Sequence, residues 1–283
     1  MLESILNESS LNESMKVLIV GDPHGDISKI KKSDLKKADL ILITGDIGKA
    51  DLARKQFFEN LKRKREGLPE LEKDAKFEKK VRMEIYDSTL SIVKELSRYA
   101  PVYSILGNVG STMIQEFERK KVEKKNKIKL PSLRKELDKI ENFYLVKNVS
   151  RNIGNLRVGF LEHFNDVSWV KEFKPKDYSK ELKRAKKESD KAKKVLRNFK
   201  NIDVLVCHAP PYGILDEVSG KFGAPKHWWG KHAGSKVILD YVKKYQPKYV
   251  FCGHIHEGKG MKKIGKSIVY NVGFNGDYVL LDI

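Results

Sequence analysis

Long hydrophobic runs are missing from this sequence. No apolar stretch in its 283 residues approaches the ~18 that a membrane-spanning helix needs. The first fourteen residues are polar and lack the basic start of a secretory signal peptide. These absences predict a soluble globular protein of the cytoplasm, with no membrane association.

Cysteine is scarce as well. The chain has two, Cys207 and Cys252, and they do not form the C-x-x-C arrangement of zinc and redox sites. Each ends an apolar run, which favours small buried residues in strands, with a disulfide or a nucleophile as the alternatives. Any chemistry is therefore expected from nitrogen and oxygen side chains.

Acidic residues are too few to balance the basic ones. There are 57 lysines and arginines against 38 aspartates and glutamates, a net charge of +19. Residues 54–82, 119–139 and 174–200 together hold 33 basic and 13 acidic side chains, whereas the rest of the chain holds 24 and 25. Lysine-rich helices are usually solvated faces, but charge this concentrated also suits nucleic acid, another polyanion or an oligomer contact. Few aromatic residues lie among these charges, so base stacking is not indicated.

Short apolar runs, each followed by glycine or polar residues, predict an α/β protein. We expect strands 143–146 and 156–161 to pair across a turn at 152–155, and the last two strands to be antiparallel. The runs lie at 17–20, 40–44, 102–106, 143–146, 156–161, 203–207, 249–252, 267–273 and 278–283.

Helical segments separate several of these runs. We predict one domain over residues 1–283 with its core at 15–283. Basic helical insertions are expected at about 51–100, 111–140 and 174–200, the first broken near Gly67 and the second at Pro131.

Side chains that can bind metal follow five of the predicted strands. Taken alone, Asp46 or Asn108 after a glycine could shape a turn, and His208 could be a core histidine. Jointly they indicate a metal site, because the carboxyl ends of parallel strands meet at one edge of a sheet. The seven residues are Asp22, His24, Asp46, Asn108, His208, His254 and His256.

Seven ligands are too many for one ion and suit two. Imidazole nitrogen and carboxylate oxygen without thiolate fit Mn, Fe, Zn or Mg. Two such ions need a shared carboxylate, and together they clamp an in-line displacement at phosphorus.

The order and spacing of these motifs resemble the calcineurin-like metallophosphoesterases, whose pattern is D-x-H, G-D, G-N-H-D/E, H-x-P-P and G-H-x-H. The matching residues are Asp22-Pro-His24, Gly45-Asp46, Gly107-Asn108, His208-Ala-Pro-Pro211 and Gly253-His254-Ile-His256. The stretch 230–260 is similar, more narrowly, to archaeal predicted phosphoesterases related to the Icc-type phosphodiesterases. The resemblance implies a two-sheet α-β-β-α sandwich with helical insertions.

The resemblance also implies roles for the seven residues. Asp22, His24 and His256 would hold a first ion, and Asn108, His208 and His254 a second, with Asp46 bridging them. Two divalent metal ions, Mn favoured and Fe, Zn, Mg or Ni as alternatives, would then generate a metal-bridging hydroxide that hydrolyses a phosphodiester or phosphomonoester. Asp46, Asn108 and His208 would act in catalysis through the metals.

One position departs from the family pattern. The third motif commonly continues with a histidine that helps the leaving group, and here it continues with Val109. Valine cannot donate a proton, and general-acid help contributes ~10²–10⁴ in rate. Another residue must supply the proton, the substrate must leave easily, or activity must be low. The missing acid slightly favours a phosphodiesterase.

Two further histidines are candidates for substrate binding or proton donation. His163 follows a predicted strand, and His232 precedes a helix N-terminus, where anions are favoured. The rival hypothesis is a polyanion- or nucleic-acid-binding protein, or a nuclease, whose metal centre is degenerate and weakly active.

Overall fold

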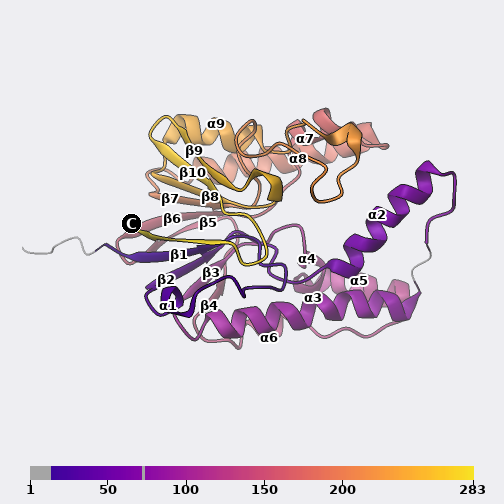
Figure 1. Cartoon of the computed structure of the whole chain (residues 1–283), viewed down its shortest axis with the longest axis horizontal. Helices are drawn as coiled ribbons and strands as arrows, with labels where there is room; N and C mark the ends of the chain where they lie inside the picture. Colours follow the sequence, from indigo (N-terminus) through magenta and orange to yellow (C-terminus); the bar gives the residue numbers. More distant parts are fainter. Residues whose placement is uncertain (1–13, 72–73) are drawn as a thin grey trace, which may run out of the picture.

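Two stacked sheets with helices on their outer faces make up the described part of the chain, residues 14–71 and 74–283 of a computed structural model (Figure 1). The strand order is β11-β1-β2-β3-β4 in the first sheet and β5-β6-β7-β8-β10-β9 in the second. The predicted α-β-β-α sandwich is confirmed. Within the described ranges, no helix is long and apolar enough to cross a membrane.

The strands that carry the predicted site are parallel neighbours. In the first sheet β1 to β4 run parallel, and in the second β6, β7, β8 and β10 do. Their carboxyl ends therefore lie together. The strands of the first sheet are β1 (Lys16–Val20), β2 (Leu40–Ile43), β3 (Val102–Ser104), β4 (Phe143–Leu145) and β11 (Tyr278–Asp282). Those of the second are β5 (Val149–Ile153), β6 (Leu156–Leu161), β7 (Val204–Cys207), β8 (Tyr249–Cys252), β9 (Gly260–Ile264) and β10 (Ser267–Asn271).

Alternation along each strand divides the core into layers. Ile19 of β1 packs with Phe160 of β6 in the layer between the sheets. Its neighbour Leu18 packs on the other side with Ile92, and Leu205 of β7 packs beneath the helices of the second sheet. Strands covered on both faces are apolar throughout, which explains their short uninterrupted hydrophobic runs.

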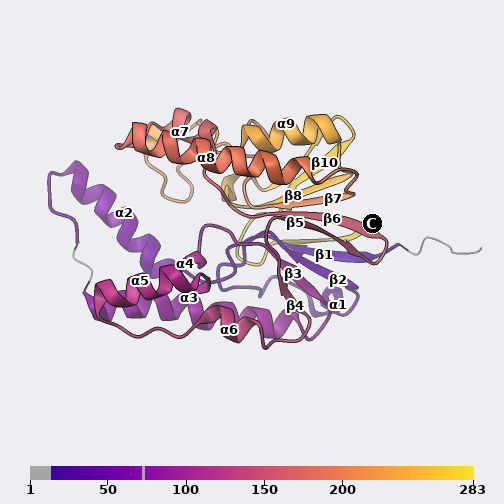
Figure 2. The same cartoon turned by 180° about the vertical axis from the view of Figure 1, so that it is seen from behind.

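The first sheet is covered by α1 (Lys32–Leu35), which lies outside the predicted insertions, and by helices of the first two of those insertions. The helices of these two insertions are α2 (Asp51–Arg65), α3 (Ala75–Leu96), α4 (Ser111–Ile114), α5 (Glu116–Asn126) and α6 (Leu133–Leu137). Helix α2 buries only Gln56 and projects away from the sheets in both views (Figures 1 and 2). Segment 111–140 is three short helices, with non-helical residues around Pro131 as predicted.

The second sheet is covered by α8 (Tyr178–Arg197) and α9 (Lys236–Tyr245), and α7 (Val167–Phe173) packs against α8 beyond the ends of the strands (Figure 2). Helix α8 is the predicted third basic helix, whereas α7 was not predicted. Two 3-10 turns, Lys226–Trp228 and His256–Gly258, lie in the loops at the carboxyl edge. The one-domain division stays a prediction.

One predicted strand pairing is wrong. β4 does not pair with β6 but extends the first sheet beside β3, and the hairpin partner of β6 is β5. The tight turn at Gly154, with φ +56°, needs a glycine and joins β5 to β6 directly. The last two strands each have an antiparallel neighbour, β9 for β10 and β1 for β11, and β10 is also parallel to β8.

Candidate metal centre

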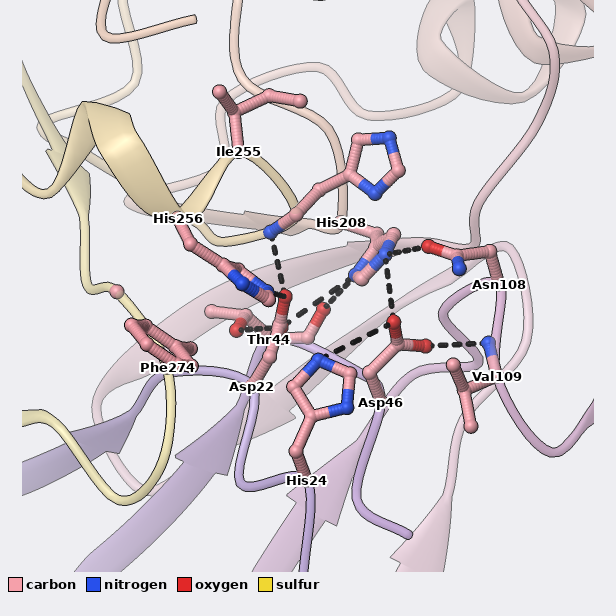
Figure 3. A network of polar contacts seen from close by, with 12 residues as sticks. Asp22, His24, Thr44, Asp46, Asn108, Val109, His208, Ile255, His256 and Phe274 are labelled. Carbon is pink, nitrogen blue, oxygen red and sulfur yellow. Dashed lines mark hydrogen bonds and ion pairs between the residues drawn. The ribbon is translucent and has the colours of Figure 1, made fainter. Parts of the chain in front are cut away.

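The seven predicted ligand residues meet between the carboxyl edges of the two sheets (Figure 3). Two groups contain residues from the first sheet: Asp22 with His24 and His256, and Asp22 with Asp46 and His208. The candidate ligand atoms within each group all lie within 4.8 Å of one another. His254 joins His208 in a further group.

The glycines of the motifs are explained by close approach. A Cβ atom added at Gly107 would overlap the Asp46 carboxylate, and one added at Gly253 would overlap that of Asp22. The ligand residues themselves adopt backbone conformations with positive φ, namely +46° at His24, +36° at Asp46 and +64° at His254. Such conformations cost about 1–3 kcal/mol each for residues other than glycine, and they cluster at functional sites.

Asp22 is fully buried and its carboxylate is held from both sides. The Thr44 hydroxyl donates to Oδ1 at 2.8 Å, and the backbone N–H of His254 donates to Oδ2 at 2.5 Å. Burial alone would raise the pKa of the Asp22 carboxyl, but the neighbouring histidines, His208 above all, lower it below its usual range. Asp22 is therefore an anion that links the two sheets.

Asp46 faces both groups of histidines. The backbone N–H of Val109 donates to its Oδ1 at 2.6 Å. The other oxygen, Oδ2, lies 3.9 Å from Nε2 of His24 and 3.5 Å from Nε2 of His208 (Figure 3). Burial raises the pKa of the Asp46 carboxyl, although His208 opposes this. One carboxylate oxygen is thus free of backbone donors and directed between the two sides of the centre.

His208 lies between hydrogen-bond acceptors. Nδ1 donates to the Thr44 carbonyl at 3.0 Å, and Nε2 lies 2.8 Å from Oδ1 of Asn108. Burial lowers the pKa of His208, but Asp46 and Asp22 outweigh this and raise it to about 9. Two buried carboxylates therefore draw a positive charge onto the ring.

Three of the other histidines at the centre are neutral. Burial lowers the pKa of His256 to about 4 and that of His163 to about 3, and it lowers that of His254 as well. Neutral imidazole is the form that binds metal. The pKa directions of these three histidines therefore suit metal ligands, whereas His208 has to lose a proton before it can bind an ion.

The donor set fits divalent cations. In the described ranges, Asp22 and Asp46 form ion pairs with histidines alone, without lysine or arginine. Nε2 of His24 is buried, and it has no hydrogen-bond partner in the part of the chain that the structure describes. Buried carboxylates beside an unsatisfied imidazole nitrogen are the environment in which a bound cation satisfies every group at once.

A large cavity with aromatic walls opens onto this centre. Its volume is about 590 Å³, and His24, Asp46, Asn108, His254 and His256 line it. We call it the aromatic cavity, after its walls Phe57, Phe58, Trp169, Phe173, Phe222 and Trp228. Arg54 of α2 donates to the carbonyl of Phe222 at 2.8 Å, which ties the projecting helix to the opposite wall.

A second cavity lies on another side of Asn108. It has a volume of about 560 Å³ and is bordered by helix α8. We call it the charged cavity, after Lys147, Glu162, Arg184, Glu188 and Lys191 in its lining. Asn108 lines both cavities, whereas Val109 lines only the aromatic one and His163 only the charged one.

The two additional histidines have different surroundings. The ring of His163 contacts those of His208 and His254, at centroid distances of 5.3 and 5.2 Å. His232 is not in a group with the ligands among the described residues, and its Nδ1 is bonded instead to the buried carboxylate of Asp216 at 2.8 Å.

Sequence reasoning missed two residues that hold the ligands. Thr44 contacts both Asp22 and His208, and its position before Gly45-Asp46 was the available signal. Phe274 stacks on the His256 ring at 4.3 Å with an interplanar angle of 4°. Nothing local in the sequence marks Phe274, since it reaches the site through the pairing of the last strands.

The chain is similar to several known proteins. Residues 15–258 match the family described as calcineurin-like phosphoesterase. A stretch of 79 residues is 39% identical to the uncharacterized protein MJ1162 of Methanocaldococcus jannaschii, covering 27% of this chain and 33% of that protein. One crystal structure superposes with a TM-score of 0.55 at 16% identity over 95% of both chains, which concerns the fold alone. The protein TT1561 of Thermus thermophilus gives a TM-score of 0.48 at 16% identity, over 95% of this chain and 94% of that one.

Proposed function

Because the chain belongs to the calcineurin-like phosphoesterase family, which supports metal-dependent phosphoester hydrolysis, we propose that it is a two-ion hydrolase that prefers phosphodiesters. The observation that carries the proposal is the position of Asp46 Oδ2, which is directed at His24 on one side and His208 on the other. A carboxylate oxygen so placed suits a bridge between two ions.

The proposed ligands divide around that bridge. Asp22, His24 and His256 would hold the first ion, and Asn108, His208 and His254 would hold the second. Bound divalent ions would lower the pKa of a water molecule and neutralise charge on the phosphoryl oxygens. Manganese is favoured, with Fe, Zn, Mg or Ni as alternatives, because the donors are mixed nitrogen and oxygen.

Residues around the ligands keep them in position. The Thr44 carbonyl orients the His208 ring, and the Val109 N–H fixes Asp46. Supporting contacts of this kind typically contribute roughly 10–100-fold in metal affinity or activity. The role of Val109 is therefore carried by its backbone.

The aromatic cavity supports a diester substrate. Arg54 is the one lysine or arginine among the described residues that line it, and its guanidinium already contacts the Phe222 carbonyl. A phosphomonoester dianion finds little extra positive charge here, whereas an organic ester group gains apolar contact with the walls. A substrate with a good leaving group also needs no acid at position 109.

The test uses two activated aryl esters, a phosphodiester and a phosphomonoester, with protein reloaded with Mn²⁺. We expect kcat/KM for the diester to exceed that for the monoester, and Asp46→Asn and His208→Ala to abolish both activities. Asp240→Asn, an exposed carboxylate on α9, serves as the matched control and should retain activity.

Two outcomes contradict the proposal. Protein that binds two ions per chain yet cleaves neither ester is not the proposed enzyme, and a preference for the monoester removes the diester assignment. Metal analysis of each preparation shows whether an inactive protein holds two ions per chain.

The rival role as a polyanion- or nucleic-acid-binding protein is favoured by one observation. The basic helix α8 borders the charged cavity next to the centre. Such a role requires affinity for nucleic acid that falls steeply with salt. The cytoplasmic location and the role of His232 stay predictions, and the contact of His232 with Asp216 supports a structural part.

A further inference from the structure

The end of β6 is drawn toward the candidate metal centre from the second sheet. The backbone N–H of His163 donates to the carbonyl of Leu106 at 2.9 Å, across the gap between the sheets. Leu106 directly precedes Gly107 and Asn108. This bond therefore brings a histidine that lies outside the family motifs next to a residue inside them.

The His163 ring completes a cluster of three. Its centroid lies 5.3 Å from that of His208 and 5.2 Å from that of His254, and those two are 4.8 Å apart. A ring nitrogen from each lies within 4.8 Å of the others. The three residues come from the ends of three parallel neighbours, β6, β7 and β8. Rigid strand ends are well suited to hold a ligand face in fixed geometry.

One nitrogen of the His163 ring is unsatisfied. Nδ1 is buried and has no hydrogen-bond partner among residues 14–71 and 74–283. Leaving a buried polar group without a partner costs about 1–3 kcal/mol, so such an atom calls for a specific partner. His24 on the other side of the centre has a buried nitrogen in the same condition.

We propose that His163 is an additional ligand of the second metal ion, forming a three-histidine face with His208 and His254. The inference rests on the proposed two-ion function, and it extends that function by making the second site richer in nitrogen than the first. Imidazole-rich sites favour Zn, Fe, Co or Ni over Mg. We therefore expect the second site to discriminate against Mg more strongly than the first.

The cavities argue against a role for His163 as a replacement for the missing histidine at 109. Val109 lines the aromatic cavity and His163 does not, whereas His163 lines the charged cavity and Val109 does not. A group that protonates a leaving group beside Val109 would have to reach the other cavity. The side chain at 163 is thus placed for the ion and not for that position.

The first experiment titrates Co²⁺ into metal-free protein, followed by visible absorption and by metal analysis after equilibrium dialysis. For His163→Gln we expect the first ion to bind as in the wild type and the second at least ~10-fold more weakly. His232→Gln, whose histidine is bonded to Asp216, is the matched control and should bind both ions normally. Wild-type affinity and spectrum for both ions in His163→Gln would overturn the inference.

A second variant gives a positive signal and does not depend on lost affinity. In His163→Cys, a thiolate that coordinates Co²⁺ adds a sulfur-to-cobalt charge-transfer band in the near ultraviolet. The band should be absent from the wild type, whose Cys207 and Cys252 are buried among apolar residues, and from His232→Cys. Folded His163→Cys protein that binds two ions without this band would also overturn the inference.

These outcomes separate the two proposals. If His163→Gln loses the second ion and metal-loaded wild type cleaves no ester, the hydrolase proposal is rejected. The proposal that His163 is a metal ligand is then retained. Active wild type with two ions, and His163 variants that bind both equally well, rejects the ligand alone. Wild type that takes up only one ion rejects both.

Discussion

The aromatic and charged cavities meet at Asn108 and differ in what they offer a substrate. Five of the seven predicted ligands line the aromatic cavity, but only Asn108 lines the charged one. The aromatic walls come from α2, α7 and the segment from Phe222 to Trp228, and the charged walls come from α8 and the loops after β4 and β6. A substrate of the proposed enzyme would thus reach the predicted ligands through an apolar entrance, although the protein is strongly basic.

The charged cavity is more balanced than the net charge of the chain suggests. Arg184 bonds to Glu188 at 2.8 Å, and Lys147 lies 3.5 Å from Glu162. Pairs that are open to solvent on one side contribute little to stability, but they leave little charge for a ligand. A high net charge therefore need not indicate where on the protein an anion binds.

The largest expected effect comes from Asn108, which the cavities share. Asn108→Ala removes a proposed ligand of the second ion and the partner of His208 Nε2. We expect kcat/KM to fall by about 10² or more, since loss of one positioned polar group at the reacting centre costs this much. The loss should be equal for small and large diesters, as measured by steady-state kinetics.

The control for this prediction is Gln115→Ala, because Gln115 lines the charged cavity only. Its activity should be close to that of the wild type. An Asn108→Ala enzyme that loses activity toward one class of diester alone would mean that Asn108 contacts the substituent of the diester. Its assignment as a ligand of the second ion would then be wrong.

The second prediction concerns pH and the metal-free protein. The pKa of His256 is lowered to about 4 and that of His163 to about 3, from an unfolded value of ~6.5. Their contribution to stability is present above pH ~6.5 and is lost as pH falls, because the unfolded chain then binds protons that the native chain does not. The His208 pKa, raised to about 9, has the opposite sign, so its contribution is lost as pH rises from ~6.5 toward 9.

Thermal unfolding in chelator should therefore show a maximum near pH ~6.5. We expect Tm to fall by ~5 °C or more between pH ~6.5 and ~4. His163 lines the charged cavity and His256 the aromatic one. His163→Gln and His256→Gln should each reduce the fall in Tm at acid pH, and the reduction should be larger for His163→Gln. An acid limb unchanged in both variants would contradict the assigned protonation states.

Much of this arrangement was predictable from the sequence, for a physical reason. Buried parallel strands need apolar residues on both faces, and ligands must follow where the strands end. Asp22, Asp46 and His208 were therefore found from local patterns. The glycines at 107 and 253 reinforced those patterns, because no larger residue fits beside the carboxylates.

What failed depends on contacts between distant segments. Phe143–Leu145 pairs with β3 and not with β6 because the first sheet has a free edge beside β3. The sequence of a single strand does not specify which sheet edge is free. The cavities are similar cases. Phe222 and Arg54 are 168 residues apart, and only the docking of α2 against the loop makes them neighbours.

A third prediction sharpens the role of the aromatic wall. The Phe222 ring lies 4.8 Å from Phe274 and 5.7 Å from His256. Phe222→Ala should raise KM for an aryl diester by about 10-fold with little change in kcat, since one aromatic contact contributes roughly 0.5–1.5 kcal/mol beyond area burial. Phe117→Ala, which alters a ring that is 76% exposed and outside both cavities, is the control.

An alkyl diester provides the internal comparison for this variant. Because it lacks a ring to stack, its KM should change less than that of the aryl diester. Equal changes for the two substrates would mean that Phe222 acts by supporting His256 through Phe274 and not by contacting the substrate.

The smallest effect is expected on the charged side. Arg184 and Lys191 line the charged cavity, but Arg184 is already paired with Glu188. Arg184→Gln and Lys191→Gln should therefore change kcat/KM for a small aryl diester by less than about 3-fold. The reason is that an exposed charge typically contributes roughly 0–1 kcal/mol to an interaction. Lys186→Gln, exposed on the same helix and absent from the lining, is the matched control. A ~10-fold loss of kcat/KM at low salt in either lining variant, with no loss in Lys186→Gln, would mean that the charged cavity binds part of the substrate. The aromatic cavity would then not be the only route to the ligands.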